Sequence, residues 1–174
     1  KIQQKKYRYE FQLYMAEGFR LVSELLESSP ELIEFIVVDE KAKHELKHDF
    51  VFQLSSVEFK EFAETQHSQG VFAVVKMPKK LKTEQILQEA KLIVVCDAVQ
   101  DPGNLGTIVR NAIWFGGDAL VLGEGTVDLY NPKTIRSCMS SLVSLPITHL
   151  NLEAFFEQAE SMGFTSYLFR LASD

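Results

Sequence analysis

The residues with the clearest chemical potential are an amide and a guanidinium that lie six positions apart. Residues 97–111 read DAVQDPGNLGTIVRN, and they contain Asn104 and Arg110. Asn104 stands where a helix would begin, so its side-chain oxygen can accept hydrogen bonds from unpaired N–H groups of the first turn. Helical side chains lean toward the N-terminus, which would bring the Arg110 guanidinium back toward this loop. The spacing therefore predicts an anion-binding site made of an amide, free N–H groups and a fixed positive charge.

The flanking residues predict the strand, loop and helix that would position this pair. Apolar residues 92–96 indicate a buried strand, and the Pro-Gly pair at 102–103 indicates a tight turn. Apolar side chains then recur at helical spacing, at Leu105, Ile108, Val109, Ala112 and Ile113. The two glycines at 116–117 are expected to end the helix. Arg110 lies off the apolar face, where an ion pair with an aspartate of the preceding loop is the alternative to a role in binding.

A second loop and helix carry two further cations. After a strand predicted at 119–122, an Asn-Pro pair is suited to cap a helix and to begin it. Lys133 and Arg136 then lie three positions apart on one helix face, close to the N-terminus. They can contact nucleic-acid phosphates, which need cations and carry no sequence information. A solvated helix face is the alternative. Apolar residues continue at helical spacing, so one helix is expected to extend to Leu142.

Strands and helices alternate along the chain, which indicates an α/β fold with two modules. Residues 1–76 are predicted to form a small N-terminal α/β domain, residues 77–90 a linker with a short helix, and residues 91–174 a domain with a parallel sheet. The expected strands are 12–16, 35–38, 50–54, 71–75, 92–96, 119–122 and 164–169. The expected helices are 19–26, 40–47, 55–65, 83–90 and 152–162. In a parallel sheet, the loops that follow the strands carry the functional site.

The composition is that of a globular protein without a membrane span. Of the 174 residues, 46% are hydrophobic and 24% are charged, and the longest apolar runs are far too short to cross a bilayer. Cys96 and Cys138 lie in apolar surroundings, and neither they nor the histidines have metal-ligand spacing, so we expect a cytoplasmic protein without a metal site. The net charge of −6 argues against indiscriminate nucleic-acid binding. Two basic clusters, at residues 1–8 and 76–82, are local contacts for RNA, or each is only a solvated face or a flexible tail.

Residues 97–112 resemble the first motif of the SpoU (TrmH-type) RNA ribose 2′-O-methyltransferases, a family of the SPOUT superfamily. The asparagine and arginine of that motif, separated by five residues, fall on Asn104 and Arg110. Residues 128–136, DLYNPKTIR, resemble the segment that follows in the family. The region around Glu17-Gly18 resembles its small N-terminal substrate-binding domain. The resemblance extends over nearly the whole chain and implies an L30e-like domain joined to a parallel-sheet α/β-knot (SPOUT) domain.

The resemblance also implies a function. The methyl donor would be S-adenosylmethionine, the acceptor a ribose of tRNA or rRNA, and the full-length protein a homodimer. Arg110 and Asn104 take the catalytic positions. In this family the matching arginine is often drawn as the general base that removes the ribose proton. Guanidinium groups have a pKa above about 12 and are poor bases, so we expect Arg110 to hold a phosphate and orient the hydroxyl.

The family's later motifs are expected after Phe169, and this chain does not contain them. They are a Gly-x-Glu-x-x-Gly loop and an Asn-Val-Ser-like segment, which in relatives thread a trefoil knot and form the S-adenosylmethionine pocket. The chain is therefore expected to be truncated before the knot, with Leu168 and Phe169 as one edge of the cofactor site. Two alternatives stay open. One is an RNA-binding module without methyl transfer, and the other is a doubly wound nucleotide-binding domain, although residues 101–107 lack a Gly-x-Gly-x-x-Gly pattern.

Overall fold

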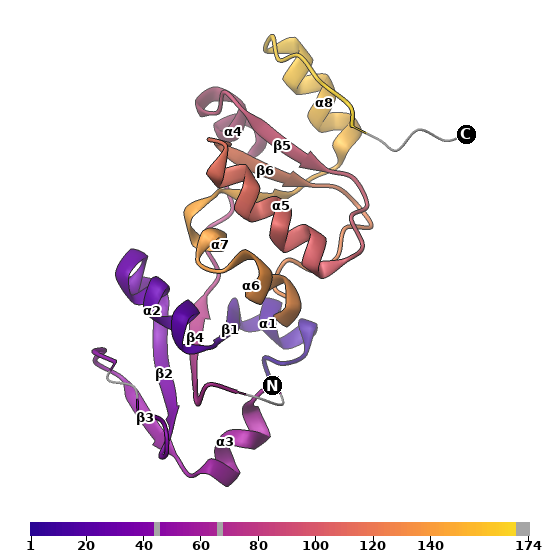
Figure 1. Cartoon of the computed structure of the whole chain (residues 1–174). Coiled ribbons are helices and arrows are strands. Elements are labelled where there is room, and N and C mark those ends of the chain that lie inside the picture. The colour runs from indigo at the N-terminus through magenta and orange to yellow at the C-terminus, as the bar shows by residue number, and fades with distance from the viewer. Residues whose placement is uncertain (44–45, 66–67, 170–174) are drawn as a thin grey trace.

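The computed structural model describes residues 1–43, 46–65 and 68–169 and forms two β-sheets (Figure 1). The N-terminal sheet has the strand order β1-β4-β2-β3, in which β1 and β2 are antiparallel to β4 and β3 is parallel to β2. Its strands are β1 (Leu13–Glu17), β2 (Ile33–Asp39), β3 (Val51–Leu54) and β4 (Val71–Lys76). The accompanying helices are α1 (Lys5–Phe11), α2 (Phe19–Ser28), the 3₁₀ turn η1 (Pro30–Leu32) and α3 (Ser56–Phe62).

Helices pack on both faces of the N-terminal sheet. The apolar side of α2 lies in one core cluster with Tyr14 of β1. On the other face, α3 places Phe59 against Phe72 of β4, with ring centroids 5.3 Å apart. The capping box expected at the start of α3 is present, because the side chains of Ser55 and Glu58 each bond the backbone N–H of the other residue. The four strands predicted for this half and the helices predicted at 19–26 and 55–65 are therefore confirmed, whereas α1 and η1 were not predicted.

The C-terminal sheet consists of three parallel strands in the order β5-β6-β7. They are β5 (Ile93–Cys96), β6 (Ala119–Leu122) and β7 (Ile147–His149). One face is covered by α5 (Pro102–Trp114), α6 (Pro132–Cys138) and α7 (Ser141–Ser144), and the other by α4 (Thr83–Glu89) and α8 (Leu152–Ser161). All four residues of β6 are buried because helices lie on both of its sides. Among the described helices, none combines the length and apolar character that crossing a membrane requires.

A buried ion pair and packed aromatic rings join the two halves. Tyr14 of β1 packs against Tyr130 in the loop between β6 and α6, with ring centroids 5.2 Å apart. Arg8 of α1 donates to one oxygen of the Asp128 carboxylate at 2.7 Å, and the Tyr9 hydroxyl donates to the other oxygen at 2.7 Å. The Arg8 and Asp128 side chains are only 6% and 9% exposed. The β6–α6 loop therefore fastens the N-terminal half to the parallel sheet.

Helices α5 and α6 cross closely at Gly106. A Cβ atom at this position would lie 2.8 Å from the carbonyl oxygen of Thr134 and 2.9 Å from the backbone nitrogen of Cys138. Both are backbone atoms, which cannot move aside as the end of a flexible side chain can. Only a residue without a side chain fits this crossing. The sequence pattern does not reveal the requirement, because Gly106 occupies an ordinary position in the predicted helix.

The helix predicted to extend to Leu142 is wrong, because the chain turns at Met139. The first helix, α6, ends at Cys138, and Met139 adopts a φ of 56°, in the left-handed region that ends helices. Leu142 belongs to the separate helix α7 and is buried. The Ser140 hydroxyl next to the turn donates to Glu24 of α2 at 3.0 Å. Periodicity could not show the break, because both short helices bury their apolar residues in the same core.

The strand predicted at 164–169 is also wrong. This segment has no regular secondary structure, and Leu168 and Phe169 are 84% and 93% exposed. A strand satisfies its N–H and C=O groups through a neighbouring strand, and none of the strands in the described ranges pairs with this segment. The helix predicted at 40–47 is absent at residues 40–43 and 46–47, while residues 44–45 lie outside the described part. Charge alone marked that segment as exposed and did not supply an apolar face to hold a helix.

Candidate functional site

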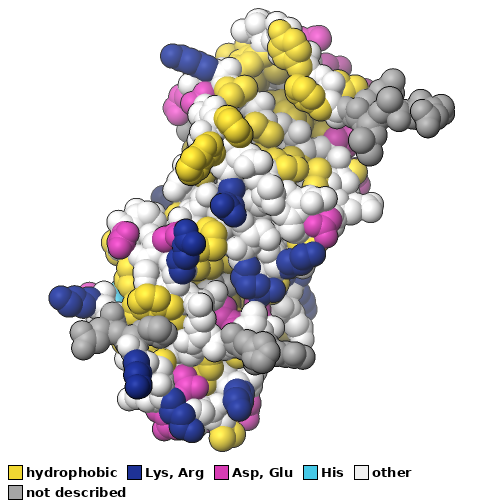
Figure 2. All heavy atoms as spheres, in the orientation of Figure 1, with side chains coloured by type: hydrophobic (Ala, Val, Ile, Leu, Met, Phe, Trp, Pro, Cys, Tyr) yellow, Lys and Arg dark blue, Asp and Glu magenta, His cyan; other side chains and the backbone are white. Residues whose placement is uncertain are grey.

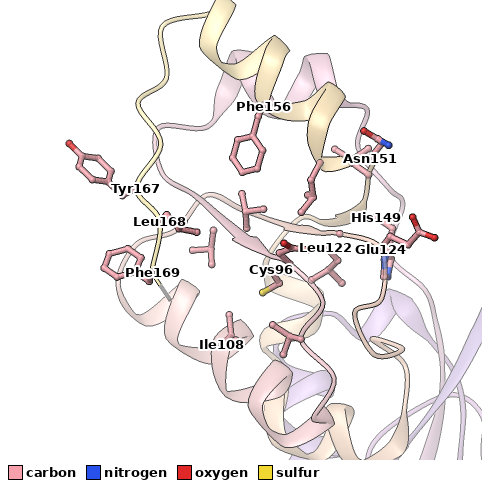
Figure 3. A pocket seen from close by; sticks show the side chains of 17 residues that line it. Cys96, Ile108, Leu122, Glu124, His149, Asn151, Phe156, Tyr167, Leu168 and Phe169 are labelled. Carbon is pink, nitrogen blue, oxygen red and sulfur yellow. The ribbon is translucent and has the colours of Figure 1, made fainter. Parts of the chain in front are cut away.

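An open hollow of about 900 Å³ lies at the carboxyl ends of β5, β6 and β7 (Figure 3). Residues that end or follow these strands line it, including Cys96, Asp97, Leu122, Gly123, Glu124, His149 and Asn151. Ile108 of α5, Phe156 of α8 and residues 167–169 complete the walls. Sites for small organic ligands typically measure roughly 300–1,000 Å³. The hollow lies at the edge of the parallel sheet where the sequence predicted a site.

The N-cap of α5 is Asp101 and not Asn104 as predicted. The Asp101 carboxylate accepts a hydrogen bond of 2.8 Å from the Asn104 backbone N–H, and Pro102 is the first helical residue. Lys133 forms a 3.2 Å ion pair with the same carboxylate. The bond from the Asn104 N–H, followed by the bond from Lys133, lowers the pKa of Asp101. The exposed Asn104 side chain forms no hydrogen bond with a described residue, so its amide is free to meet a ligand.

Arg110 is exposed on α5, and neither loop aspartate neutralises it. Within the described part of the chain it forms no ion pair, and Asp101 binds Lys133 instead. Positions 108 and 110 are separated by about 200° around a helix. Because Ile108 lines the hollow, Arg110 faces away from it. Burial raises the pKa of the Cys138 thiol on α6 to about 12, and the charge of Arg110 is a minor influence that lowers it.

Lys133 and Arg136 diverge although both belong to α6. Lys133 reaches α5, whereas the Arg136 Nη1 lies 3.9 Å from an oxygen of Glu64 in the N-terminal half. Arg136 and Arg20 line a second hollow of about 310 Å³ between the two halves. Burial, and after it the neighbouring Glu17 carboxylate, raises the pKa of Glu64 to about 7, while Arg136 opposes this change. The two cations predicted as one RNA-binding pair therefore border different surfaces.

The wall formed by the end of the described chain contains both residues predicted as the cofactor edge. Leu168 and Phe169 line the hollow, and Figure 3 shows the Leu168 side chain directed toward its interior while Tyr167 points away. Glu124 and His149 also line the hollow, and the sequence reasoning did not name them as site residues. Their positions directly after β6 and β7 were the available signal, because residues that follow parallel strands meet at one edge.

Comparison with known proteins decides the family. Residues 91–174 match the SpoU rRNA Methylase family, and residues 1–73 match the MRM3-like substrate binding domain. The chain belongs to the SpoU rRNA methylase family. This confirms the resemblance seen in the sequence. It also confirms the α/β fold class with an N-terminal substrate-binding domain and a parallel sheet.

Named relatives of this SpoU chain are rRNA methyltransferases. The 23S rRNA (guanosine(2553)-2′-O)-methyltransferase RlmP of Bacillus subtilis is 37% identical over 169 residues, which cover 96% of this chain and 66% of that protein. The human mitochondrial rRNA methyltransferase 3 is 30% identical over 148 residues, which cover 80% of this chain and 35% of that protein. The crystal structure of an AdoMet-bound rRNA methyltransferase from Sinorhizobium meliloti matches with a TM-score of 0.75 and 27% identity, over 92% of this chain and 63% of that one. The chain thus spans under two thirds of the bacterial relatives and about a third of the human one.

Proposed function

We propose that the protein containing this chain transfers a methyl group from S-adenosylmethionine to the 2′-hydroxyl of an RNA ribose. The observation that carries the proposal is the hollow at the ends of β5, β6 and β7, which lies within the residues that match the SpoU family. The matching structure from Sinorhizobium meliloti holds AdoMet, and the Bacillus relative is named as a 23S rRNA 2′-O-methyltransferase. Of the two substrates expected from the sequence, these relatives favour rRNA over tRNA.

The residues around the hollow fit S-adenosylmethionine. When bound, this cofactor supplies an electrophilic methyl group on a positively charged sulfur. Apolar side chains such as Ile108 suit the adenine ring, and the exposed carboxylates of Asp97 and Glu124 suit the cationic groups. We infer that Leu168 and Phe169 contribute one wall of the bound cofactor's environment. The cofactor assignment therefore rests on the chemistry of the walls as well as on the relatives.

The cations on α5 and α6 are suited to hold the RNA. Arg110 presents a guanidinium that forms no ion pair with a described residue, and its planar fork can form two hydrogen bonds to a phosphate. A guanidinium stays protonated in proteins, so we assign Arg110 to orienting the ribose and stabilising charge, not to removing the proton. We infer that the exposed Asn104 amide, which forms no hydrogen bond with a described residue, assists it. We infer that Lys133 and Arg136 contact phosphates, each exchanging its exposed or partly exposed carboxylate partner for RNA.

We infer that the complete protein works as a homodimer. Arg110 faces away from the hollow of its own chain, so an Arg110 from a second copy is needed beside that hollow. This arrangement would let each hollow receive a cation that its own α5 cannot supply. The cellular location stays a prediction: a bacterial relative fits the cytoplasmic setting expected from the sequence, whereas the human relative is named as mitochondrial.

Methyl transfer by Arg110 variants tests the proposed function. With labelled S-adenosylmethionine and rRNA, Arg110→Ala should lower the rate by about 10²–10³, since a charge contact made in the transition state is lost. Arg110→Lys should be nearly as slow, because a point charge cannot replace the planar fork. Lys91→Ala is the control, since Lys91 is an exposed cation before β5, at the end away from the hollow. Near-normal turnover by either Arg110 variant would overturn its role.

The same assay separates the enzyme from the binding-module alternative. If the unaltered protein transfers methyl groups to RNA, the enzymatic reading holds. If it binds RNA with the salt dependence expected of phosphate contacts but transfers nothing, the chain is part of an RNA-binding module.

A further inference from the structure

Two basic clusters that are distant in the sequence meet at the ring of Tyr9. The ammonium groups of Lys5 and Lys80 lie 5.8 Å and 5.9 Å from the centre of this ring. Neither lysine forms an ion pair with a residue of the described ranges. An aromatic ring attracts cations electrostatically but does not neutralise them. The contact therefore concentrates positive charge beside α1.

Helix α1 holds this charge on a fixed platform. Arg8 is buried and donates at 2.7 Å to Asp128 of the β6–α6 loop and at 2.6 Å to the Gln3 carbonyl oxygen. The Tyr9 hydroxyl donates to the same Asp128 carboxylate, which orients the ring. Asp128 is already paired with Arg8, so its charge is not available to balance two further lysines. The flexible tail considered from the sequence is thus excluded for Lys5–Phe11.

His149 connects the platform with the hollow. It is the last residue of β7 and lines the hollow. Burial is the largest influence that lowers the pKa of His149; the charges of Lys80 and Lys5 lower it further, and Asp128 opposes them. The lysines are therefore close enough for their field to reach a residue in the wall of the hollow. Among the described residues, no carboxylate forms an ion pair with either lysine.

We propose that Lys5 and Lys80, held around Tyr9, bind backbone phosphates of the RNA substrate beside the rim of the hollow. The inference rests on the proposed function and adds a contact region separate from the α5–α6 surface. Phosphodiesters suit this region because each carries the negative charge that the unpaired lysines lack. A strand that delivers its ribose to the hollow would pass His149 and meet these lysines.

The remaining side chains of α1 also suit RNA. Its sequence, KKYRYEF, combines basic and aromatic residues with a single acid, Glu10, and basic and aromatic side chains occur together where bases stack and phosphates follow a cationic surface. The rings of Tyr7 and Phe11 are stacked with centroids 6.2 Å apart, and Phe11 is 48% exposed. An acidic protein segment would meet the lysines equally well but would leave these rings without a planar partner. The aromatic pair therefore favours RNA as the occupant.

The test is the salt dependence of RNA binding by the protein that contains this chain. The double variant Lys5→Gln/Lys80→Gln is compared with Lys60→Gln/Lys91→Gln, which removes the same charge from two exposed lysines elsewhere. Each lost phosphate contact with single-stranded RNA reduces the slope of log K against log salt concentration by about 0.7, so the first variant should lose about 1.4. Its affinity deficit should then shrink about sevenfold between 50 and 200 mM salt. The control slope should stay unchanged.

Three outcomes would overturn the proposal. The first is that the Lys5→Gln/Lys80→Gln variant keeps the original salt slope. The second is that both double variants change the slope equally. The third is that the unaltered protein binds no RNA at low salt. An equal change would mean that total charge, and not this site, determines the effect. Methyl transfer measured on the same RNA keeps the proposed function separate. If the unaltered protein transfers methyl groups but the Lys5/Lys80 variant keeps the original salt slope, only the lysine site is refuted. If the slope changes but no methyl group is transferred, only the proposed enzymatic activity is refuted.

Discussion

Removing either partner of the buried ion pair between Arg8 and Asp128 should destabilise the chain strongly. The two side chains are 6% and 9% exposed, and the bond length is 2.7 Å. Removing one partner of a buried ion pair typically costs about 3–5 kcal/mol, because an unpaired charge stays buried. The pair also attaches α1 to the β6–α6 loop, so its loss should loosen the contact between the two halves.

The local hydrogen bonds indicate which variant should be worse. Arg8→Met leaves the Asp128 carboxylate with two hydrogen-bond donors, the Tyr9 hydroxyl at 2.7 Å and the Tyr130 N–H at 3.3 Å. We therefore expect this variant to lower the free energy of unfolding by about 3 kcal/mol. Asp128→Leu leaves the Arg8 guanidinium with carbonyl oxygens alone and also removes the acceptor of the buried Tyr9 hydroxyl. We expect this change to lower the free energy of unfolding by about 5 kcal/mol. For a chain of this length, these losses correspond to a fall in Tm of about 6–20 °C.

Thermal and urea unfolding of both single variants and of the double variant Arg8→Met/Asp128→Leu would measure the coupling. The double variant should be more stable than the sum of the single losses predicts, by about 2–3 kcal/mol, because it leaves no charge unpaired. The matched control is Lys76→Met, which breaks a 3.0 Å pair with Glu34 whose side chains are 50% and 41% exposed. It should cost less than about 1 kcal/mol. Equal costs for Lys76→Met and Arg8→Met, or strict additivity of the two buried changes, would refute this reasoning.

Three further predictions follow from particular contacts. Gly106→Ala should lower the free energy of unfolding by about 1–3 kcal/mol, despite the better helix propensity of alanine, because its Cβ would collide with backbone atoms of α6; Thr107→Ala, an exposed neighbour, should change it by less than about 0.5 kcal/mol in the same melts. Glu64 has a folded pKa raised to about 7, so the folded state binds more protons than the unfolded state and stability should fall as pH rises from about 5 to 7; Glu64→Gln should flatten that fall in urea titrations at each pH. Arg110→Ala and Ile108→Trp, which fills the hollow, should each be inactive alone. If each site uses residues of both copies, mixing the two variants should restore about a quarter of the methyl transfer of the unaltered protein. No recovery after subunit exchange would contradict the homodimer.

Most of the fold could be predicted because the apolar pattern of each element reflects its burial. Leu105, Val109 and Ala112 were assigned to one face of a helix and are buried there. The pattern failed where tertiary contacts decide the local structure. Met139 adopts a left-handed conformation between two short helices that share one core, and no spacing of apolar residues distinguishes this from one longer helix. The exposed segment after Gly163 looked like a strand because its residues favour strands, yet no described strand pairs with it.

The candidate site was only partly predictable, for a related reason. Asn104 and Arg110 could be predicted as a pair because they lie within one helix, where spacing fixes relative position; their role stays a prediction. The partners of the other cations are distant in sequence: Lys133 binds Asp101, and Arg136 approaches Glu64. Such pairs depend on how α6 packs against α5 and the N-terminal half. The N-cap assignment failed more locally, because an Asp-Pro pair precedes Asn104 and forms the stronger helix start.

The β6–α6 loop connects the proposed lysine site around Tyr9 with the hollow. Gly123 and Glu124 begin this loop and line the hollow. Asp128, five positions after Gly123, binds Arg8 and Tyr9 of α1. A phosphate bound by the lysines around Tyr9 would therefore rest on the same short loop that shapes the hollow. Because both contacts of Asp128 are buried or partly buried, the loop cannot shift at one end without disturbing the other. This gives a physical reason for the substrate-binding half to be packed rigidly against the parallel sheet: the distance from a bound backbone to the reactive ribose is then fixed before the RNA arrives.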